Sequence, residues 1–208
     1  MLEVVASWII NVISSLGYPG IILTMAIESA LIPLPSEIIM PFSGFLVSSG
    51  KFSLHLVALS GALGNLIGSL LAYGLGYWGH ERIVRKLVRR YGKWILLTET
   101  ELDYAEKLMH KYKDVVVLTS RVVPGVRTVI SLPAGIARLP IYRFIILTFL
   151  GSLIWSYFLA YIGFVLGENW KTIGIYFHGA DAIVGAILGV LLGLYIYHKL
   201  KPSQKITS

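Results

Sequence analysis

Cysteine is absent from this chain of 208 residues, which excludes disulfide bonds, thiolate metal sites and cysteine nucleophiles. Charged residues are also scarce, at 14% against the roughly 25% of an average soluble domain. Hydrophobic residues make up 56% of the sequence and gather in long runs. A chain in lipid must satisfy its own backbone hydrogen bonds, and long apolar runs do so as helices. The composition therefore predicts a polytopic all-α membrane protein with a single membrane domain over residues 1–208.

The polar residues that are present do not indicate metals or nucleic acid. The five histidines show no spacing typical of metal ligands, and we expect neither a metal site nor a cofactor. The formal net charge is +7, but the basic residues lie beside apolar segments and do not form a solvated patch. This distribution favours lipid headgroups over nucleic acid as the partner.

One apolar run, residues 119–135, contains two arginines and two prolines. Pro124 and Pro133 each remove a backbone donor, so the chain there must be broken and packed inside protein. Arg121 and Arg127 also need to face a partner or a wet cavity inside the protein, since an uncompensated charge at the bilayer centre costs from about 2.5 kcal/mol upward. We therefore predict that residues 114–137 form a re-entrant hairpin, which enters the membrane and returns to the same side.

A second broken segment precedes this one and supplies anions. Residues 21–48 are apolar, are interrupted at Pro33 and Pro35, and carry Glu28 and Glu37. A shift of 91 residues aligns the two segments: Pro33 falls on Pro124, Ser36 on Arg127, Glu37 on Thr128 and Gly44 on Gly135. A related Gly-x-Leu-Ile sequence follows each segment, at residues 64–67 and 151–154. These matches predict two repeats, residues 17–79 and 114–167, whose re-entrant hairpins face each other.

Three further apolar stretches are long enough to span a membrane as helices: residues 53–78, 141–166 and 174–198. Residues 2–16 also form an apolar helix, and the sequence leaves open whether it spans the membrane or lies in the interface. The last span carries Gly185, Gly189 and Gly193. Small residues at this spacing allow close helix contact, either within one protomer or between the protomers of a homodimer.

Basic residues are concentrated in residues 80–93, and more lysines follow the last span. By the positive-inside rule, this loop and the C-terminus lie in the cytoplasm. A charged amphipathic stretch continues to residue 113 and is expected to lie on the inner surface. The second hairpin then enters from the cytoplasm and the first from outside, which is the arrangement of an inverted repeat.

If the hairpins meet near the bilayer midplane, the two glutamates come close to the two arginines. Arginine binds phosphate through paired donors and keeps its charge, and a buried carboxyl is able to load and release a proton. The predicted phosphate-binding residues are Arg121, Arg127, Thr128 and Ser36, and the predicted proton-coupling residues are Glu28 and Glu37. The predicted hairpin-breaking residues are Pro33, Pro35, Pro124, Pro133 and Gly135. The alternative is a purely structural salt-bridge cluster.

Two motifs resemble the signature hairpins of the bacterial DedA family, whose eukaryotic relatives are VTT-domain scramblases. They are Pro-Leu-Pro-Ser-Glu at residues 33–37, preceded by Glu28, and Ser-Arg-Val-Val-Pro-Gly-Val-Arg-Thr at residues 120–128, followed by Pro-Ala-Gly. The resemblance covers nearly the whole chain. It implies facing hairpins and proton-motive-force-dependent transport of anionic lipid carriers, notably undecaprenyl phosphate, across the bacterial cytoplasmic membrane. It assigns the family's acidic positions to Glu28 and Glu37 and its essential arginines to Arg121 and Arg127. Many members have glycine where this chain has Ser36.

The leading prediction is a flippase that returns a polyprenyl phosphate from the outer to the inner leaflet. One alternative is a flippase for a phospholipid, for example phosphatidylethanolamine. Another is a proton or cation antiporter, which two arginines in the pathway would oppose. A lipid phosphatase would need a histidine nucleophile six residues after Arg121, where this chain has Arg127, so we expect no enzyme activity.

Overall fold

The computed structural model describes residues 2–30, 32, 34–79, 109, 114–123 and 126–172, without the side chains of residues 2, 3 and 170–172. These residues form helices, turns and loops, and they include no strand. The all-α prediction is confirmed for this part of the chain. The predicted cytoplasmic segment 80–113, apart from Met109, lies outside the described residues. So do the predicted last span 174–198, the C-terminal tail, and the predicted hairpin breakers Pro33 and Pro124.

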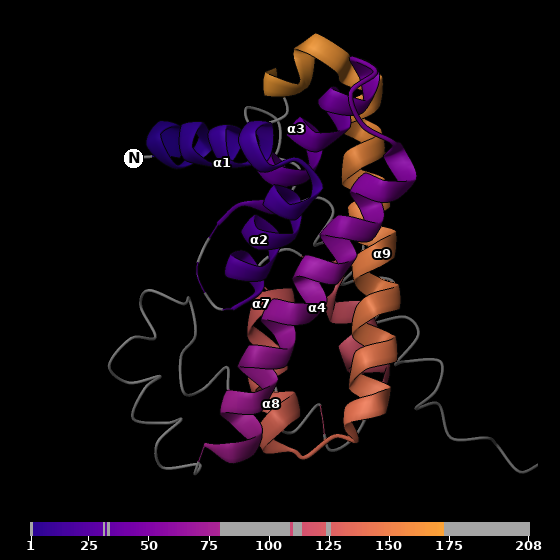
Figure 1. Ribbon diagram of the computed structural model, residues 1–208. Coiled ribbons are helices and arrows are strands. Elements are labelled where there is room, and N and C mark those ends of the chain that lie inside the picture. The colour runs from indigo at the N-terminus through magenta and orange to yellow at the C-terminus, as the bar shows by residue number, and fades with distance from the viewer. Residues whose placement is uncertain are drawn as a thin grey trace, which may run out of the picture.

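Two long helices, α4 (Leu54–Trp78) and α9 (Ile141–Leu166), pack against each other, and the shorter helices pack around them (Figure 1). They match the predicted helices 53–78 and 141–166, because long apolar runs leave little choice of boundaries. Both are long and apolar enough to cross a membrane by length and composition. At 1.5 Å per residue they measure about 38 and 39 Å, against a hydrocarbon core of about 30 Å. They run in opposite directions, since Tyr73 near the end of α4 packs on Phe144 near the start of α9.

The first broken segment comprises α2 (Tyr18–Ser29) and α3 (Ser36–Ser48), and the described residues between them are not helical. Pro35 is extended and immediately precedes α3, as expected of a break. The two ends of the segment meet. The Tyr18 ring stacks on Phe52 with centroids 4.7 Å apart, and its hydroxyl accepts a 2.8 Å hydrogen bond from the Ser53 backbone.

The second broken segment comprises a helix at residues 114–120, a turn at 121–123, α7 (Val126–Val129) and α8 (Ser131–Ile136). The predicted breakers Pro133 and Gly135 both lie inside α8. Pro133 is in the first turn of α8, and its missing backbone donor separates α7 from α8 at Ile130 without reversing the chain. Gly135 instead serves a helix contact.

Each broken segment packs its second helix against the long helix of the other predicted repeat, α3 on α9 and α8 on α4. Four glycines allow these contacts: Gly44 lies against Ala160, Gly163 against Pro41, Gly135 against Tyr73 and Gly76 against Leu132. A Cβ atom at any of the four would collide with a backbone carbonyl oxygen. With shifts of 91 residues for the broken segments and 87 for the long helices, the first two contacts are equivalent to the last two.

Helices α3 and α8 also end in the same way, with the hydrogen bonds of a Schellman cap. The bonds are Gly50 N to Val47 O (2.9 Å) and Lys51 N to Leu46 O (3.0 Å) for α3, and Arg138 N to Gly135 O (3.0 Å) and Leu139 N to Ala134 O (3.1 Å) for α8. The left-handed residue is Gly50 (φ 75°) in the first cap and Arg138 (φ 51°) in the second. A residue with a side chain pays about 1–2 kcal/mol for this conformation.

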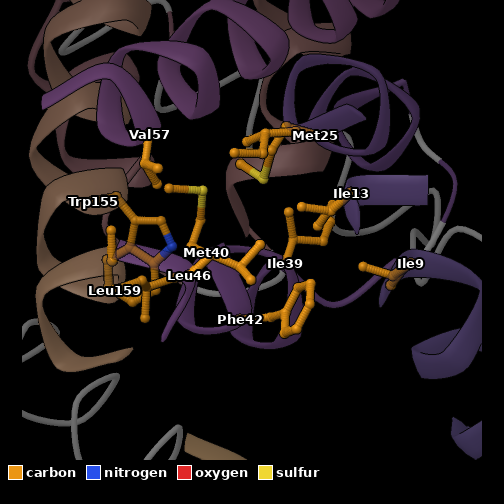
Figure 2. Close-up of a cluster of buried hydrophobic side chains, with 12 residues drawn as sticks. Ile9, Ile13, Met25, Ile39, Met40, Phe42, Leu46, Val57, Trp155 and Leu159 are labelled. Carbon is orange, nitrogen blue, oxygen red and sulfur yellow. The ribbon is translucent and has the colours of Figure 1, made fainter. Parts of the chain in front are cut away.

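The largest apolar cluster lies where α1 (Leu2–Leu16), α2, α3, α4 and α9 converge (Figure 2). Ile39 and Met40 of α3 occupy its centre, between Trp155 of α9 on one side and Ile13 of α1 on the other. Helix α1 runs across the direction of α4 and α9 in Figure 1. A second cluster contains Tyr73, Val117 and Phe144 and joins the second broken segment to α4 and α9.

Candidate functional site

Arg127 connects the two broken segments. It lies in α7 with 2% of its surface exposed, and its Nη2 donates hydrogen bonds to the Glu28 carboxylate and to the Ser36 hydroxyl. Glu28 is in the last turn of α2, and Ser36 is the first residue of α3. The break in the first segment therefore faces the break in the second. Ser36 and Arg127 are aligned by the repeat, 91 residues apart, and here they touch.

Arg121 is also buried, with 1% of its surface exposed, but it binds no carboxylate among the described residues. Its Nη1 donates to the Ser69 hydroxyl (3.0 Å) and to the backbone oxygen of Arg127 (2.9 Å). Its Nη2 donates to the Ser131 hydroxyl (3.1 Å), and its guanidinium lies 5.4 Å from the centre of the Phe144 ring. The remaining donor, Nε, is buried and has no partner in the described part of the chain.

The two arginines thus share one buried carboxylate, that of Glu28. Glu37 is half-buried and close enough to Glu28 for the two charges to repel, but it makes no hydrogen bond or ion pair among the described residues. The predicted pairing of both glutamates with both arginines is therefore seen only for Glu28 and Arg127. Burying an unpaired charge is costly, and the Glu37 charge is only half-buried and bonded to neither arginine, so the lack of a carboxylate bonded to Arg121 in the described part of the chain favours a further anion there.

A polar network extends from Arg121 to the crossing of α4 and α9. Ser69 donates to the side-chain oxygen of Asn65 (3.4 Å), and Ser152 donates to the same oxygen (2.6 Å). Asn65 and Ser152 are 87 residues apart and are the second residues of the two Gly-x-Leu-Ile sequences. Matching positions of the two predicted repeats therefore touch where the long helices cross.

The remaining site residues divide into predicted and unpredicted ones. Thr128 follows Arg127 in α7 and is half-buried. Trp155 was not predicted, although its ring centre lies 5.7 Å from the Arg127 guanidinium and Figure 2 shows it beside Met40. Ser69 and Ser131 were also missed. A small polar residue in an apolar helix is the signal that could have identified both. Among the described residues, no group of three His, Asp or Glu side chains could hold a metal ion.

Comparison with known proteins gives a consistent family match. The VTT domain model matches residues 34–165. The chain is 34% identical over 202 residues to the uncharacterized membrane protein YkoX of Bacillus subtilis, covering 97% of this chain and 87% of the relative. It is 33% identical over 173 residues to undecaprenyl phosphate transporter A of the same organism, covering 83% and 81%. It is 34% identical over 194 residues to an alkaline phosphatase-like protein of Lactococcus lactis, covering 92% and 91%. No solved structure matches.

Proposed function

This chain belongs to the VTT-domain, or DedA, family, and from that premise we propose that it moves a polyprenyl phosphate between the leaflets of the bacterial cytoplasmic membrane. The relative named undecaprenyl phosphate transporter A supports this lipid as the substrate. A phospholipid is the alternative cargo, since its headgroup offers the same phosphate chemistry.

The observation that carries the proposal is that the buried Arg121 lacks a carboxylate partner within the described structure. Arg121 has a buried Nε without a partner and no carboxylate among the described residues, whereas Arg127 already binds Glu28. A lipid phosphate would supply the missing negative charge and accept hydrogen bonds from the guanidinium groups. In this proposal, Ser36 and Thr128 add hydroxyl donors beside Arg127.

The proposed membrane arrangement is an inverted repeat with two re-entrant hairpins. Three features support it: the ends of the first broken segment meet, both breaks converge on Arg127, and the glycine contacts of the two halves are equivalent. The headgroup would pass between the breaks while the hydrocarbon tail stays in the bilayer. In this arrangement α1 lies along the membrane surface, because it crosses the direction of α4 and α9 and measures only about 22 Å.

Proton coupling would act through Glu28. Its carboxylate competes with the lipid phosphate for Arg127, because both are acceptors for the same donors. Protonation of Glu28 at the outer face would free Arg127 for the headgroup, and ionisation at the inner face would displace it. Lipid movement toward the cytoplasm would then follow the proton gradient.

The phosphatase-like name of one relative indicates a different chemistry, the hydrolysis of a phosphate ester. Such a reaction needs an activated nucleophile beside the arginines. In the described part of the chain, the side chains bonded to the two guanidiniums are Glu28 and the hydroxyls of Ser36, Ser69 and Ser131. None of these hydroxyls is hydrogen-bonded to a histidine or lysine there, so we favour a transporter.

The test is transport by the purified protein in lipid vesicles that contain a fluorescent polyprenyl phosphate. Wild type should move the lipid between leaflets, and Arg127→Ala should not. Arg143→Ala is the matched control, because Arg143 is exposed and paired with Asp114 at 3.5 Å. Release of inorganic phosphate by wild type but not by Arg127→Ala would establish the enzyme instead. Movement of labelled phosphatidylethanolamine but not of the polyprenyl phosphate would change the cargo.

A further inference from the structure

The loop after α8 contains an exposed arginine in a conformation that favours glycine. Arg138 has a φ of 51°, and the bonds of the α8 cap hold its backbone. The next residue is fixed as well, since the Tyr73 hydroxyl donates a 2.6 Å hydrogen bond to the Leu139 carbonyl. A non-glycine residue that is held in this region against its preference often marks a functional position.

The first repeat supplies an internal comparison. The same position in the α3 cap is Gly50, with a φ of 75°. A Cβ atom at Gly50 would meet no atom within 4 Å, so lack of space does not explain the glycine there. Backbone conformation alone favours glycine at both caps, and only the second repeat has an arginine. The side chain of Arg138 is therefore the feature that distinguishes the second cap from the first.

The Arg138 guanidinium lies 5.8 Å from the centre of the Tyr77 ring, at the end of α4. Within residues 34–79, 114–123 and 126–172, it forms no ion pair or hydrogen bond. Arg143 at the same end of the molecule differs, because it is paired with Asp114 and hydrogen-bonded to the Tyr142 hydroxyl at 3.2 Å. Of these two arginines, Arg138 is the one available to an external anion.

The surroundings of Arg138 fit the boundary between lipid and water. Trp78 is 84% exposed, and Tyr77, Ile141 and Tyr142 are exposed at the same end. Aromatic side chains at helix ends are typical of the headgroup level of a membrane, where phosphate groups are abundant. We propose that Arg138 and Tyr77 form a surface site for the phosphate of an anionic phospholipid headgroup, separate from the buried site of Arg121 and Arg127. The site depends on membrane placement but not on which lipid is transported.

The experiment measures unfolding temperature for the full-length protein in detergent micelles, with added phosphatidylglycerol, phosphatidylcholine or inorganic phosphate. Phosphatidylglycerol should raise the unfolding temperature of wild type and of Arg143→Ala by several degrees, but should not change that of Arg138→Gly. Without lipid, Arg138→Gly should unfold at or above the wild-type temperature, because glycine adopts this backbone conformation freely. Native mass spectrometry should find one fewer retained phosphatidylglycerol on Arg138→Gly than on Arg143→Ala.

Three outcomes would overturn the site. The first is an unchanged phosphatidylglycerol effect in Arg138→Gly. The second is an equal loss in Arg143→Ala, which would mean general attraction to basic charge. The third is an equal effect of phosphatidylcholine or of inorganic phosphate on wild type. None of these results bears on transport through Arg127, so failure of this site leaves the proposed function standing.

Discussion

Arg127 donates to Glu28 and Ser36 from one terminal nitrogen, and in the proposed site the planar fork of its guanidinium would hold the lipid phosphate. Arg127→Lys keeps the charge but loses the fork. We expect transport to fall about tenfold or more, since one charge-assisted hydrogen bond contributes about 1.5–3 kcal/mol. The measurement is vesicle transport beside Arg143→Lys, which should match wild type. Full activity of Arg127→Lys would mean that charge balance alone matters.

The two glutamates should differ because only Glu28 is bonded to Arg127. Glu28→Gln imitates the protonated carboxyl, so it should keep lipid binding, lose the response to a pH gradient and leave only slow equilibration between leaflets. Glu37→Gln should show the same change more weakly. The measurement is polyprenyl-phosphate uptake with and without an imposed gradient. If both variants respond as wild type does, the carboxylates are structural partners and the coupling mechanism is wrong.

The sequence predicted the main charged residues of the site but not all their partners. We predicted Arg121, Arg127 and Glu28 because an ionisable residue within an apolar run is costly unless it has a partner or a function. We did not predict Ser69, Ser131 or Trp155, because serine and tryptophan are common in membrane helices. The conformation of Arg138 had no local signal either, because a left-handed cap is normally read from glycine or asparagine. These features depend on contacts between distant parts of the chain.

At the scale of the helix, Gly74 and Gly76 on α4 form a matched pair. A Cβ at Gly76 would meet the backbone of α8, which is unable to move without shifting the helix. A Cβ at Gly74 would meet only the exposed ring of Trp78. Gly76→Ala should therefore lower the free energy of unfolding by about 1–3 kcal/mol. Gly74→Ala should be neutral or stabilising by up to about 1 kcal/mol.

Unfolding of both variants in mixed detergent micelles measures this difference. A stable Gly76→Ala protein would contradict the close contact between α8 and α4. The same substitution at Gly163 should reproduce the loss, because Gly163 meets the backbone of α3 at Pro41.

Helix boundaries were predicted well where hydrophobic length decided them, as in α4 and α9. The break before α3 was also predicted, and Pro35 there is extended and immediately precedes the helix. The prediction was wrong for Gly135, which lies inside α8 and serves packing, whereas Pro133 interrupts the helix only between α7 and α8. The sequence alone could not distinguish these uses.

At the scale of the molecule, the proposed inverted repeat predicts that the end of α3 and residues 86–93 lie on opposite sides of the membrane. The chain has no cysteine, so single cysteines report their own position. A cysteine at Ser48 or Ser49, at the end of α3, should react with an impermeant thiol reagent from outside intact cells. One within residues 86–93 should react only after the membrane is opened. Reaction of both from the same side would contradict the inverted repeat.

If the chain is the inverted repeat proposed above, the hydrogen bond between Asn65 and Ser152 has a consequence for the origin of the chain. In an inverted repeat, equivalent positions that touch each other lie on the two-fold axis. Before gene duplication, that position in a half-length ancestor would have met its own copy across a homodimer. Copies in opposite orientations require a chain that inserted into the membrane both ways, with lysine and arginine nearly balanced on its two sides. The basic residues between the repeats would then be the addition that fixed one orientation for the duplicated gene.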